Sequence, residues 1–239
     1  MSARSRSFAH PAVTATVGVA AVGTLIATYF VRSPMWLDEA LSVNISRLPL
    51  GDIAGALRHD GHPPLFYVLL HLWISVFGDG DRAVRALSAT ISIATLPLVR
   101  ASARRAIGER GALTAMLVFA LSPFVLRYGS EARMYSLVIA EVFAGYLAVT
   151  MSLERTSVRR LAAVTLVGAA LLWTHYWSFW LLGAVGLLLV ARLVLQARSG
   201  DRDAAMRTLR TGVALGCSVV LFVPWIPTLL YQNAHTGTP

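Results

Sequence analysis

The chain has 239 residues, of which 56% are hydrophobic and only 14% are charged, and its mean hydropathy is +0.63. A soluble domain carries about 25% charged residues, so this composition excludes an ordinary soluble protein and predicts an all-α integral membrane protein. The net charge of +9 would suit a nucleic-acid partner, but the arginines lie between apolar runs and we expect none. The single Cys217 lies within an apolar run, which excludes a disulfide framework.

Seven of the eight apolar runs are interpreted as membrane-spanning helices. The first follows Arg4 and Arg6, as in a signal peptide, but it is longer than a signal core and lacks a clear small-residue cleavage site, so we expect a retained span. A spanning helix needs about 20 residues, and the hairpin from Leu161 to Ala191 leaves both of its helices short of that length. The predicted spans, all in one membrane domain of residues 1–239, cover about residues 12–31, 83–99, 111–126, 135–153, 161–173, 178–191 and 212–230.

The remaining run, residues 63–77, decides the topology. It is short and opens on Pro63 and Pro64, which suit the first turn of a helix, so we expect it to lie in the membrane interface or to re-enter rather than cross. Two thirds of the 21 arginines then fall on the cytoplasmic side, as the positive-inside rule requires. This predicts a cytoplasmic-membrane protein with its N-terminus inside, its C-terminus outside, and a large external loop over residues 32–82.

Polar side chains gather on the predicted external segments. Because loops that close a helical bundle meet at its rim, we expect these groups to share one cavity. Arginine binds phosphate through two parallel hydrogen bonds, a carboxylate can take a proton from an attacking hydroxyl, and carboxylate with histidine can hold a divalent metal. The set therefore suits a phosphorylated substrate, and its members are Asp38, Glu39, Asp60, His62, Arg85, Glu131, Arg133, Tyr135, His175 and Tyr176.

The acids of this set also have structural interpretations. Asp38 and Glu39 stand where acids cap the helix that follows them. Arg127 and Glu131 have the i,i+4 spacing of a local ion pair on one helix face. Both interpretations stay open beside the catalytic one.

The histidines and one intramembrane acid have structural alternatives too. Asp60 and His62 either bind a metal or cap the loop before the two prolines, and His175 either joins the site or simply lies in the interface among aromatics. Glu141 lies inside a predicted span, where a charge costs about 2.5–3.5 kcal/mol. It must face the bundle or be protonated, and its role is either a structural hydrogen bond or catalysis.

Four motifs occur in a fixed order: Trp36-Leu37-Asp38-Glu39, His62-Pro63-Pro64-Leu65, Arg85 at the head of the second span, and Ser130-Glu131-Ala132-Arg133-Met134-Tyr135. Together they resemble the polytopic glycosyltransferases of fold class C that use lipid-linked sugars. Among these, the chain is most similar to the bacterial relatives of protein O-mannosyltransferases and aminoarabinose transferases. The resemblance covers roughly residues 30–235.

The resemblance implies roles for the candidates. The acid after the first span, here Asp38 with Glu39 beside it, would activate the acceptor, and a second acid, best matched by Glu131, would help to bind metal or acceptor. Arg85 would contact the lipid phosphate.

We place Arg133 and Tyr135 with Arg85 as donor-phosphate ligands. Asp60, His62 and His175 are the candidate metal ligands, although the sequence allows a divalent metal without requiring one.

The expected function is transfer of a sugar, mannose or another, from a polyprenyl-phosphate donor to a protein, glycan or lipid acceptor. The reaction would take place at the outer face of the cytoplasmic membrane, among membrane lipids, with inversion at the anomeric carbon. The alternatives are a lipid-phosphate carrier or transporter, and an inactive scaffold subunit of the same fold. Similar enzymes usually continue beyond the seventh span, so a fragment, a split gene product and a minimal member all remain open.

Overall fold

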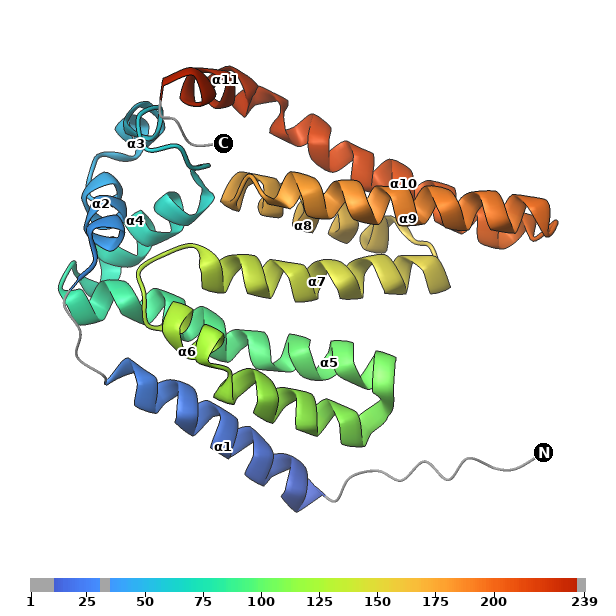
Figure 1. Cartoon of the computed structure of the whole chain (residues 1–239), viewed down its shortest axis with the longest axis horizontal. Helices are drawn as coiled ribbons and strands as arrows, with labels where there is room; N and C mark the ends of the chain where they lie inside the picture. The colour runs from blue at the N-terminus through green and yellow to red at the C-terminus, as the bar shows by residue number, and fades with distance from the viewer. Residues whose placement is uncertain (1–10, 31–34, 236–239) are drawn as a thin grey trace.

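The computed structural model describes residues 11–30 and 35–235, and within these ranges every regular element is a helix (Figure 1). Arg4, Arg6 and Arg32, which entered the topology prediction, lie outside the described residues. The elements are α1 (Pro11–Tyr29), α2 (Leu37–Ser46), α3 (Leu50–Leu57), α4 (Leu65–Phe77), α5 (Asp81–Leu121), α6 (Pro123–Gly129), α7 (Tyr135–Glu154), α8 (Val158–Thr174), α9 (Ser178–Arg198), α10 (Arg202–Phe222), the 3₁₀ turn η1 (Val223–Trp225) and α11 (Ile226–His235).

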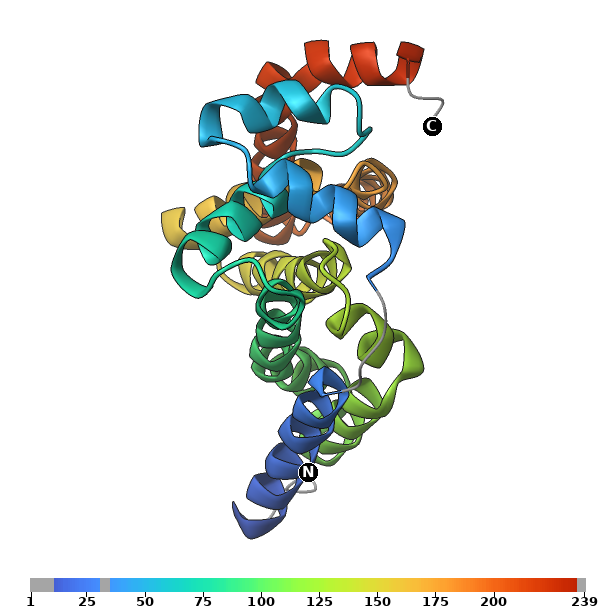
Figure 2. The same ribbon diagram turned by 90° about the vertical axis from the view of Figure 1, so that its left-hand side faces the viewer.

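The long helices form one antiparallel bundle. α7 packs between α5 and α8, α10 packs on α8 and α9, and α1 covers α5. In Figure 1 the short helices α2, α3, α4 and α11 all lie at the left-hand end of the bundle, which we call the capped end. Figure 2 looks onto this end and shows α2 and α4 lying across the ends of the longer helices.

Gly108 turns α5 back on itself. Its φ of 82° and ψ of 179° interrupt the 41-residue element, and this backbone conformation is open to glycine and strained for other residues. Figure 1 shows two antiparallel legs on either side of the turn. The first leg covers the predicted span at 83–99, whereas the predicted span at 111–126 is divided by a break at Ser122, between the second leg and α6.

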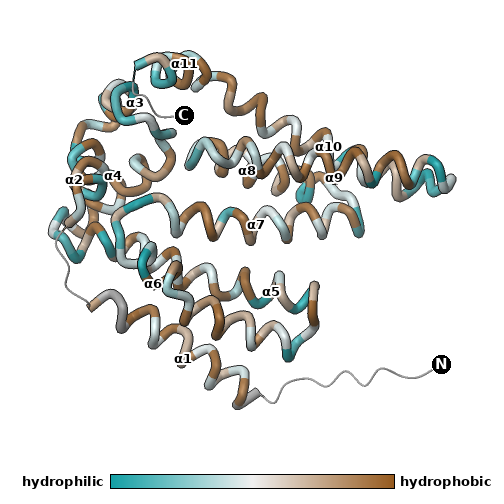
Figure 3. The backbone as a smooth tube through the Cα atoms, in the orientation of Figure 1, coloured by the Kyte–Doolittle hydropathy of each residue, from teal (hydrophilic) through white to brown (hydrophobic). Residues whose placement is uncertain are grey.

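Four helical segments in the described part of the chain are long and apolar enough to cross a membrane: Asp81–Leu121, Tyr135–Glu154, Ser178–Arg198 and Arg202–His235. The protein is therefore a membrane protein with an all-helical fold, while the count of seven spans stays a prediction. Figure 3 shows that hydrophobic residues follow the long helices and that hydrophilic residues gather at their ends.

Three further predicted segments differ from the helices observed. The helices at the predicted spans 161–173 and 178–191 extend beyond those limits, because α8 has 17 residues and α9 has 21, with polar end residues continuing each helix. The predicted last span, 212–230, is interrupted by η1. Pro224 has no backbone N–H to donate, and the chain makes a 3₁₀ turn there before α11 begins.

The predicted external loop is mostly helical. Helix α4, with 13 residues, falls within the predicted interfacial segment 63–77 and packs against α2 and α5. At about 1.5 Å per residue it is roughly 20 Å long, too short for a bilayer core of about 30 Å. Its buried face, with Phe66, Tyr67 and Leu70, attaches the capped end to the bundle.

Candidate active site

The first turn of α2 separates the two neighbouring acids. Trp36 is the N-cap residue, and its backbone N–H donates to Glu39 Oε2 at 3.0 Å, so Glu39 caps the helix. Asp38, one residue earlier, turns outward with 68% of its side chain exposed. The capping interpretation therefore holds for Glu39, and Asp38 is the accessible carboxylate.

Glu39 is held in a buried ion pair. Arg85 donates from Nε to Oε1 at 2.9 Å and from Nη2 to Oε2 at 2.7 Å, and the backbone N–H of Ala132 donates to Oε1 at 2.9 Å. With the N–H of Trp36, each carboxylate oxygen accepts two hydrogen bonds, which fills the roughly four acceptor sites of a carboxylate. Burial by itself raises the pKa of Glu39, but the hydrogen bonds from Arg85 and from the two backbone amides outweigh it and lower the pKa below its usual value.

The ion pair joins three segments of the chain: α2, the start of α5, and the turn between α6 and α7. Arg85 and Glu39 each have about a tenth or less of their side chain exposed. The geometry favours a structural role for both residues, in place of the phosphate-binding role predicted for Arg85 and the catalytic role predicted for Glu39.

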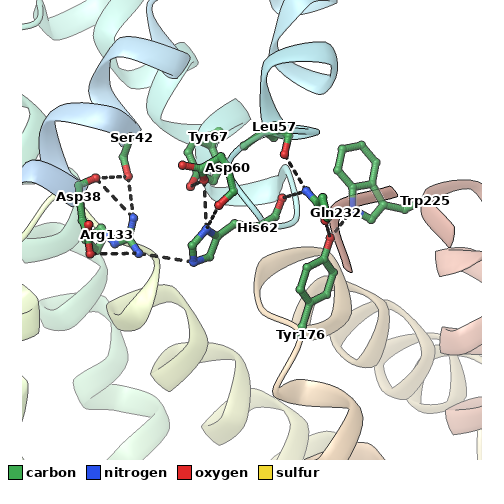
Figure 4. A network of polar contacts seen from close by, with 10 residues as sticks. All are labelled: Asp38, Ser42, Leu57, Asp60, His62, Tyr67, Arg133, Tyr176, Trp225 and Gln232. Carbon is green, nitrogen blue, oxygen red and sulfur yellow. Dashed lines mark hydrogen bonds and ion pairs between the residues drawn. The ribbon is translucent and has the colours of Figure 1, made fainter. Parts of the chain in front are cut away.

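Arg133, in the turn between α6 and α7, is the central cation of the capped end (Figure 4). Its Nη1 donates to Ser42 Oγ at 3.2 Å and to the backbone oxygen of Asp38 at 3.4 Å. Its Nη2 lies 3.9 Å from Asp38 Oδ2 and 3.5 Å from His62 Nε2. Only 6% of the residue is exposed, and its Nε is buried without a hydrogen-bond partner. An unpartnered buried donor costs about 1–3 kcal/mol, so this guanidinium keeps hydrogen-bonding capacity that its present neighbours do not use.

Asp60 fixes the orientation of His62. Tyr67 donates from its hydroxyl to Asp60 Oδ2 at 2.5 Å, and His62 Nδ1 lies 3.0 Å from the same oxygen. Assigning the proton to Nδ1, as this pairing favours, leaves Nε2 as an acceptor toward Arg133. Burial raises the pKa of Asp60, but the bonds from His62 and Tyr67 outweigh it, so the pKa is lowered and the carboxyl stays ionised.

Aromatic rings complete the site. The ring of His175 lies edge-on to that of His62, with centroids 6.3 Å apart, and 6.2 Å from the ring of Tyr135. The guanidinium carbon of Arg133 lies 5.9 Å from the centroid of the Tyr135 ring. Burial, with additional contributions from His62 and Arg133, lowers the pKa of His175, so the imidazole is neutral at pH 7.

A divalent metal on Asp60, His62 and His175 does not fit this arrangement. His62 Nδ1 is directed at Asp60, and its Nε2 faces the cationic Arg133. Within residues 11–30 and 35–235, no group of three or more His, Cys, Asp or Glu side chains is arranged to hold a metal ion.

The side chain of Glu131 pairs with a residue of its own turn. Its Oε1 accepts from Arg127 Nε at 3.1 Å, the i,i+4 pair that the spacing allowed. The local-pair interpretation therefore fits Glu131 better than a role beside Asp38, and it leaves Asp38, Asp60, His62, Arg133, Tyr135 and His175 as the group that the structure brings together.

Three residues of the polar network at the capped end were not predicted from the sequence. Ser42 lies one helical turn after Asp38, so the i,i+4 spacing could have identified it. Tyr67 stands in the first turn after the His-Pro-Pro motif, where an aromatic residue is easily taken for core. Gln232 contacts residues about 170 positions earlier in the chain, which no local pattern reveals.

Comparison with known proteins identifies the family. A family model described as dolichyl-phosphate-mannose-protein mannosyltransferase matches residues 61–230, more than two thirds of the chain. The matched segment includes His62, Arg133 and His175, whereas α2 with Asp38 precedes it. The comparison found no match among the curated proteins or the solved structures. The chain therefore belongs to the dolichyl-phosphate-mannose-protein mannosyltransferase family.

Proposed function

We propose that this membrane glycosyltransferase moves a sugar from a polyprenyl-phosphate donor to an acceptor hydroxyl at the capped end of the bundle. The observation that supports the proposal most is the pairing of an accessible carboxylate with an under-satisfied cation. Asp38 is largely exposed, and 3.9 Å from its Oδ2 lies a guanidinium that is almost fully buried and has an unpartnered Nε. The exposed carboxylate of Asp38 suits contact with an acceptor, and the guanidinium of Arg133 suits contact with the phosphate of a lipid-linked donor.

The chemistry needs one displacement. Asp38 takes the proton of the acceptor hydroxyl as its oxygen forms a bond to the anomeric carbon, and the bond from that carbon to the phosphate oxygen breaks on the opposite side. The anomeric centre is inverted and polyprenyl phosphate leaves. Negative charge grows on the departing phosphate, so a preorganised donor such as Arg133 stabilises the transition state more than the ground state.

The surroundings of Arg133 support this role. Ser42 and His62 hold its Nη atoms in place before substrate arrives, so little reorganisation is needed during the reaction. Tyr135 and the neutral His175 add aromatic surface beside the guanidinium without adding positive charge. A sugar ring packs well on such surface.

The arrangement of the arginines supports an outward-facing site. The C-terminal ends of α7 and α9 lie at the bundle end opposite the capped end (Figure 1), and they carry Arg155 as the C-cap of α7 and Arg198 as the last residue of α9. Under the positive-inside rule that end faces the cytoplasm. The capped end, with Asp38 and Arg133, then meets acceptors at the outer surface of the cytoplasmic membrane.

Family membership favours a transferase over the carrier and scaffold alternatives. A carrier would use polar groups near the bilayer centre, whereas Glu141 pairs with Thr174, the last residue of α8, beside His175. Thr174 donates to Glu141 Oε1 at 2.9 Å, while Oε2 is buried without a partner. This geometry gives Glu141 a contact between α7 and α8, and we assign it no step in transfer.

The test is an Asp38→Asn variant of the full chain in lipid nanodiscs, supplied with a polyprenyl-phosphate sugar and candidate acceptors. We expect turnover to fall about 10²–10⁴-fold, the usual contribution of a general base. Asp52→Asn is the matched control, because Asp52 is an exposed acid in the first turn of α3 at the same end. Near-normal turnover by correctly folded Asp38→Asn protein would contradict the assignment, as would retention of the donor's anomeric configuration in the product.

A further inference from the structure

Gln232 connects the C-terminal helix to the loop that carries Asp60 and His62. The residue is 1% exposed, and its Nε2 donates to the backbone oxygen of Leu57 at 2.7 Å and of His62 at 3.3 Å (Figure 4). Leu57 is the last residue of α3, and His62 closes the loop before α4. One side chain therefore bridges the two ends of the loop.

The orientation of the Gln232 amide is fixed by a chain of donors. Trp225 Nε1, which can only donate, bonds to the Tyr176 hydroxyl oxygen at 2.9 Å. The proton of Tyr176 then goes to Gln232 Oε1. Burial raises the pKa of Tyr176 to about 12, so the hydroxyl keeps this proton at neutral pH. With Oε1 occupied as an acceptor, the amide nitrogen must face the two carbonyls.

We propose that Gln232 is a positioning residue that holds the Asp60–His62 loop in the conformation in which His62 supports Arg133. Its link to catalysis rests on the proposed function, while its effect on the loop does not. The chain of contacts runs from the α8–α9 turn through α11 to the loop and ends at Arg133.

The loop needs such a contact because its own backbone hydrogen bonds are local, each running to a residue three or four positions earlier. Gly61 adopts a φ of 82°, and the backbone amides of Asp60 and Gly61 both turn back to the same oxygen of Leu57, at 3.1 and 3.4 Å. Pro63 and Pro64, which follow His62, have no backbone N–H to contribute. The side-chain amide of Gln232 therefore adds hydrogen bonds that tie both ends of the loop to α11.

The first arm of the test measures the loop directly. Gln232→Met keeps the length of the side chain and removes its hydrogen bonds, and Tyr176→Phe removes the bond that orients it. Gln196→Met is the matched control, because Gln196 is the chain's other glutamine and contacts Thr208 at the opposite end of the bundle. In nanodiscs, we expect amide exchange over residues 58–62 to rise about tenfold in Gln232→Met, the factor for two lost hydrogen bonds, less in Tyr176→Phe, and not in the control.

The second arm measures transfer in the same variants. A displaced Arg133 would lose contacts that matter in the transition state, so kcat should fall about 10- to 100-fold in Gln232→Met while KM for the donor stays within about threefold. A Gln196→Met variant should match the wild type in both constants. A variant that merely unfolds would instead lose active molecules, which thermal unfolding and gel filtration detect.

The outcomes separate the two hypotheses. Unchanged exchange over residues 58–62 in Gln232→Met, or increased exchange with wild-type kcat, would overturn the positioning role. If Gln232→Met does not fold, Tyr176→Phe decides by the same two measurements. If the wild type transfers no sugar from any polyprenyl-phosphate donor, the proposed function fails, and the exchange arm still decides whether Gln232 holds the loop.

Discussion

The ion pair between Glu39 and Arg85 offers a test of the structure that needs no substrate. Glu39→Gln keeps the shape of the side chain but removes its charge and turns one acceptor into a donor that faces other N–H groups. Removing one partner of a buried pair costs about 3–5 kcal/mol, and both side chains here are almost fully buried. For a chain of this size each kcal/mol shifts Tm by about 2–4 °C, so we expect Tm to fall by roughly 6–20 °C.

The assay is thermal unfolding of purified protein in one detergent, followed by intrinsic tryptophan fluorescence and by loss of the monodisperse peak. Asp38→Asn is the control, because Asp38 is exposed and should change Tm by no more than a few degrees. The double variant Glu39→Gln with Arg85→Gln should recover part of the loss, since neither charge is then left buried alone. An unchanged Tm in Glu39→Gln would refute the structural role of the pair.

The same pair predicts an acid limit to stability. Because the folded pKa of Glu39 is lowered from a usual value of 4.5, its contribution is present above about pH 4.5 and is lost as the pH falls through the lower folded value. Wild-type Tm should therefore fall with acid below pH 4.5 more steeply than the Tm of Glu39→Gln. Parallel curves would contradict the reasoning.

Three further predictions concern separate parts of the chain. Arg133→Lys keeps the charge but loses the planar fork, so kcat/KM should fall about 10²–10³-fold in transfer assays while the protein still folds; activity within twofold would contradict phosphate binding. Glu141→Gln keeps an acceptor for Thr174, so transfer should stay within about threefold, whereas a large loss would revive the carrier alternative. Gly108→Ala should lower stability by about 1–3 kcal/mol because of the φ of 82°, and Gly55→Ala, with nothing within 4 Å of the added methyl, should not.

Much of the fold was predictable because membrane helices must be apolar over the length that crosses the bilayer core. The periodic return of arginine clusters located the turns at the end opposite the capped end, and the prolines before α4 located its start. The breaks at Gly108 and Pro224 follow from single residues whose backbone properties are known, but only the first was anticipated as a turn. The limits of α8 and α9 were missed because polar residues continue a helix beyond its apolar run.

The candidate site was only partly predictable. Asp38 and Glu39 are adjacent and chemically alike, yet the 100° step between successive helix positions turns one outward and the other inward toward Arg85. Sequence could place both at the start of a helix but could not say which would meet a buried arginine 46 positions later. Gln232 was missed for the same reason, since its partners depend on how α11 crosses the capped end.

The neighbouring pair also provides the most direct test of the central claim, that Asp38 acts on the acceptor and Glu39 on the fold. Single-turnover transfer from a polyprenyl-phosphate sugar should be measured per folded molecule for Asp38→Asn and Glu39→Gln, at a temperature where both variants are folded. We expect Asp38→Asn to bind donor with nearly wild-type affinity and to turn over at least about 10²-fold more slowly, while the folded fraction of Glu39→Gln keeps most of the wild-type rate. The opposite pattern, with a fast Asp38→Asn and a slow but fully stable Glu39→Gln, would contradict the account.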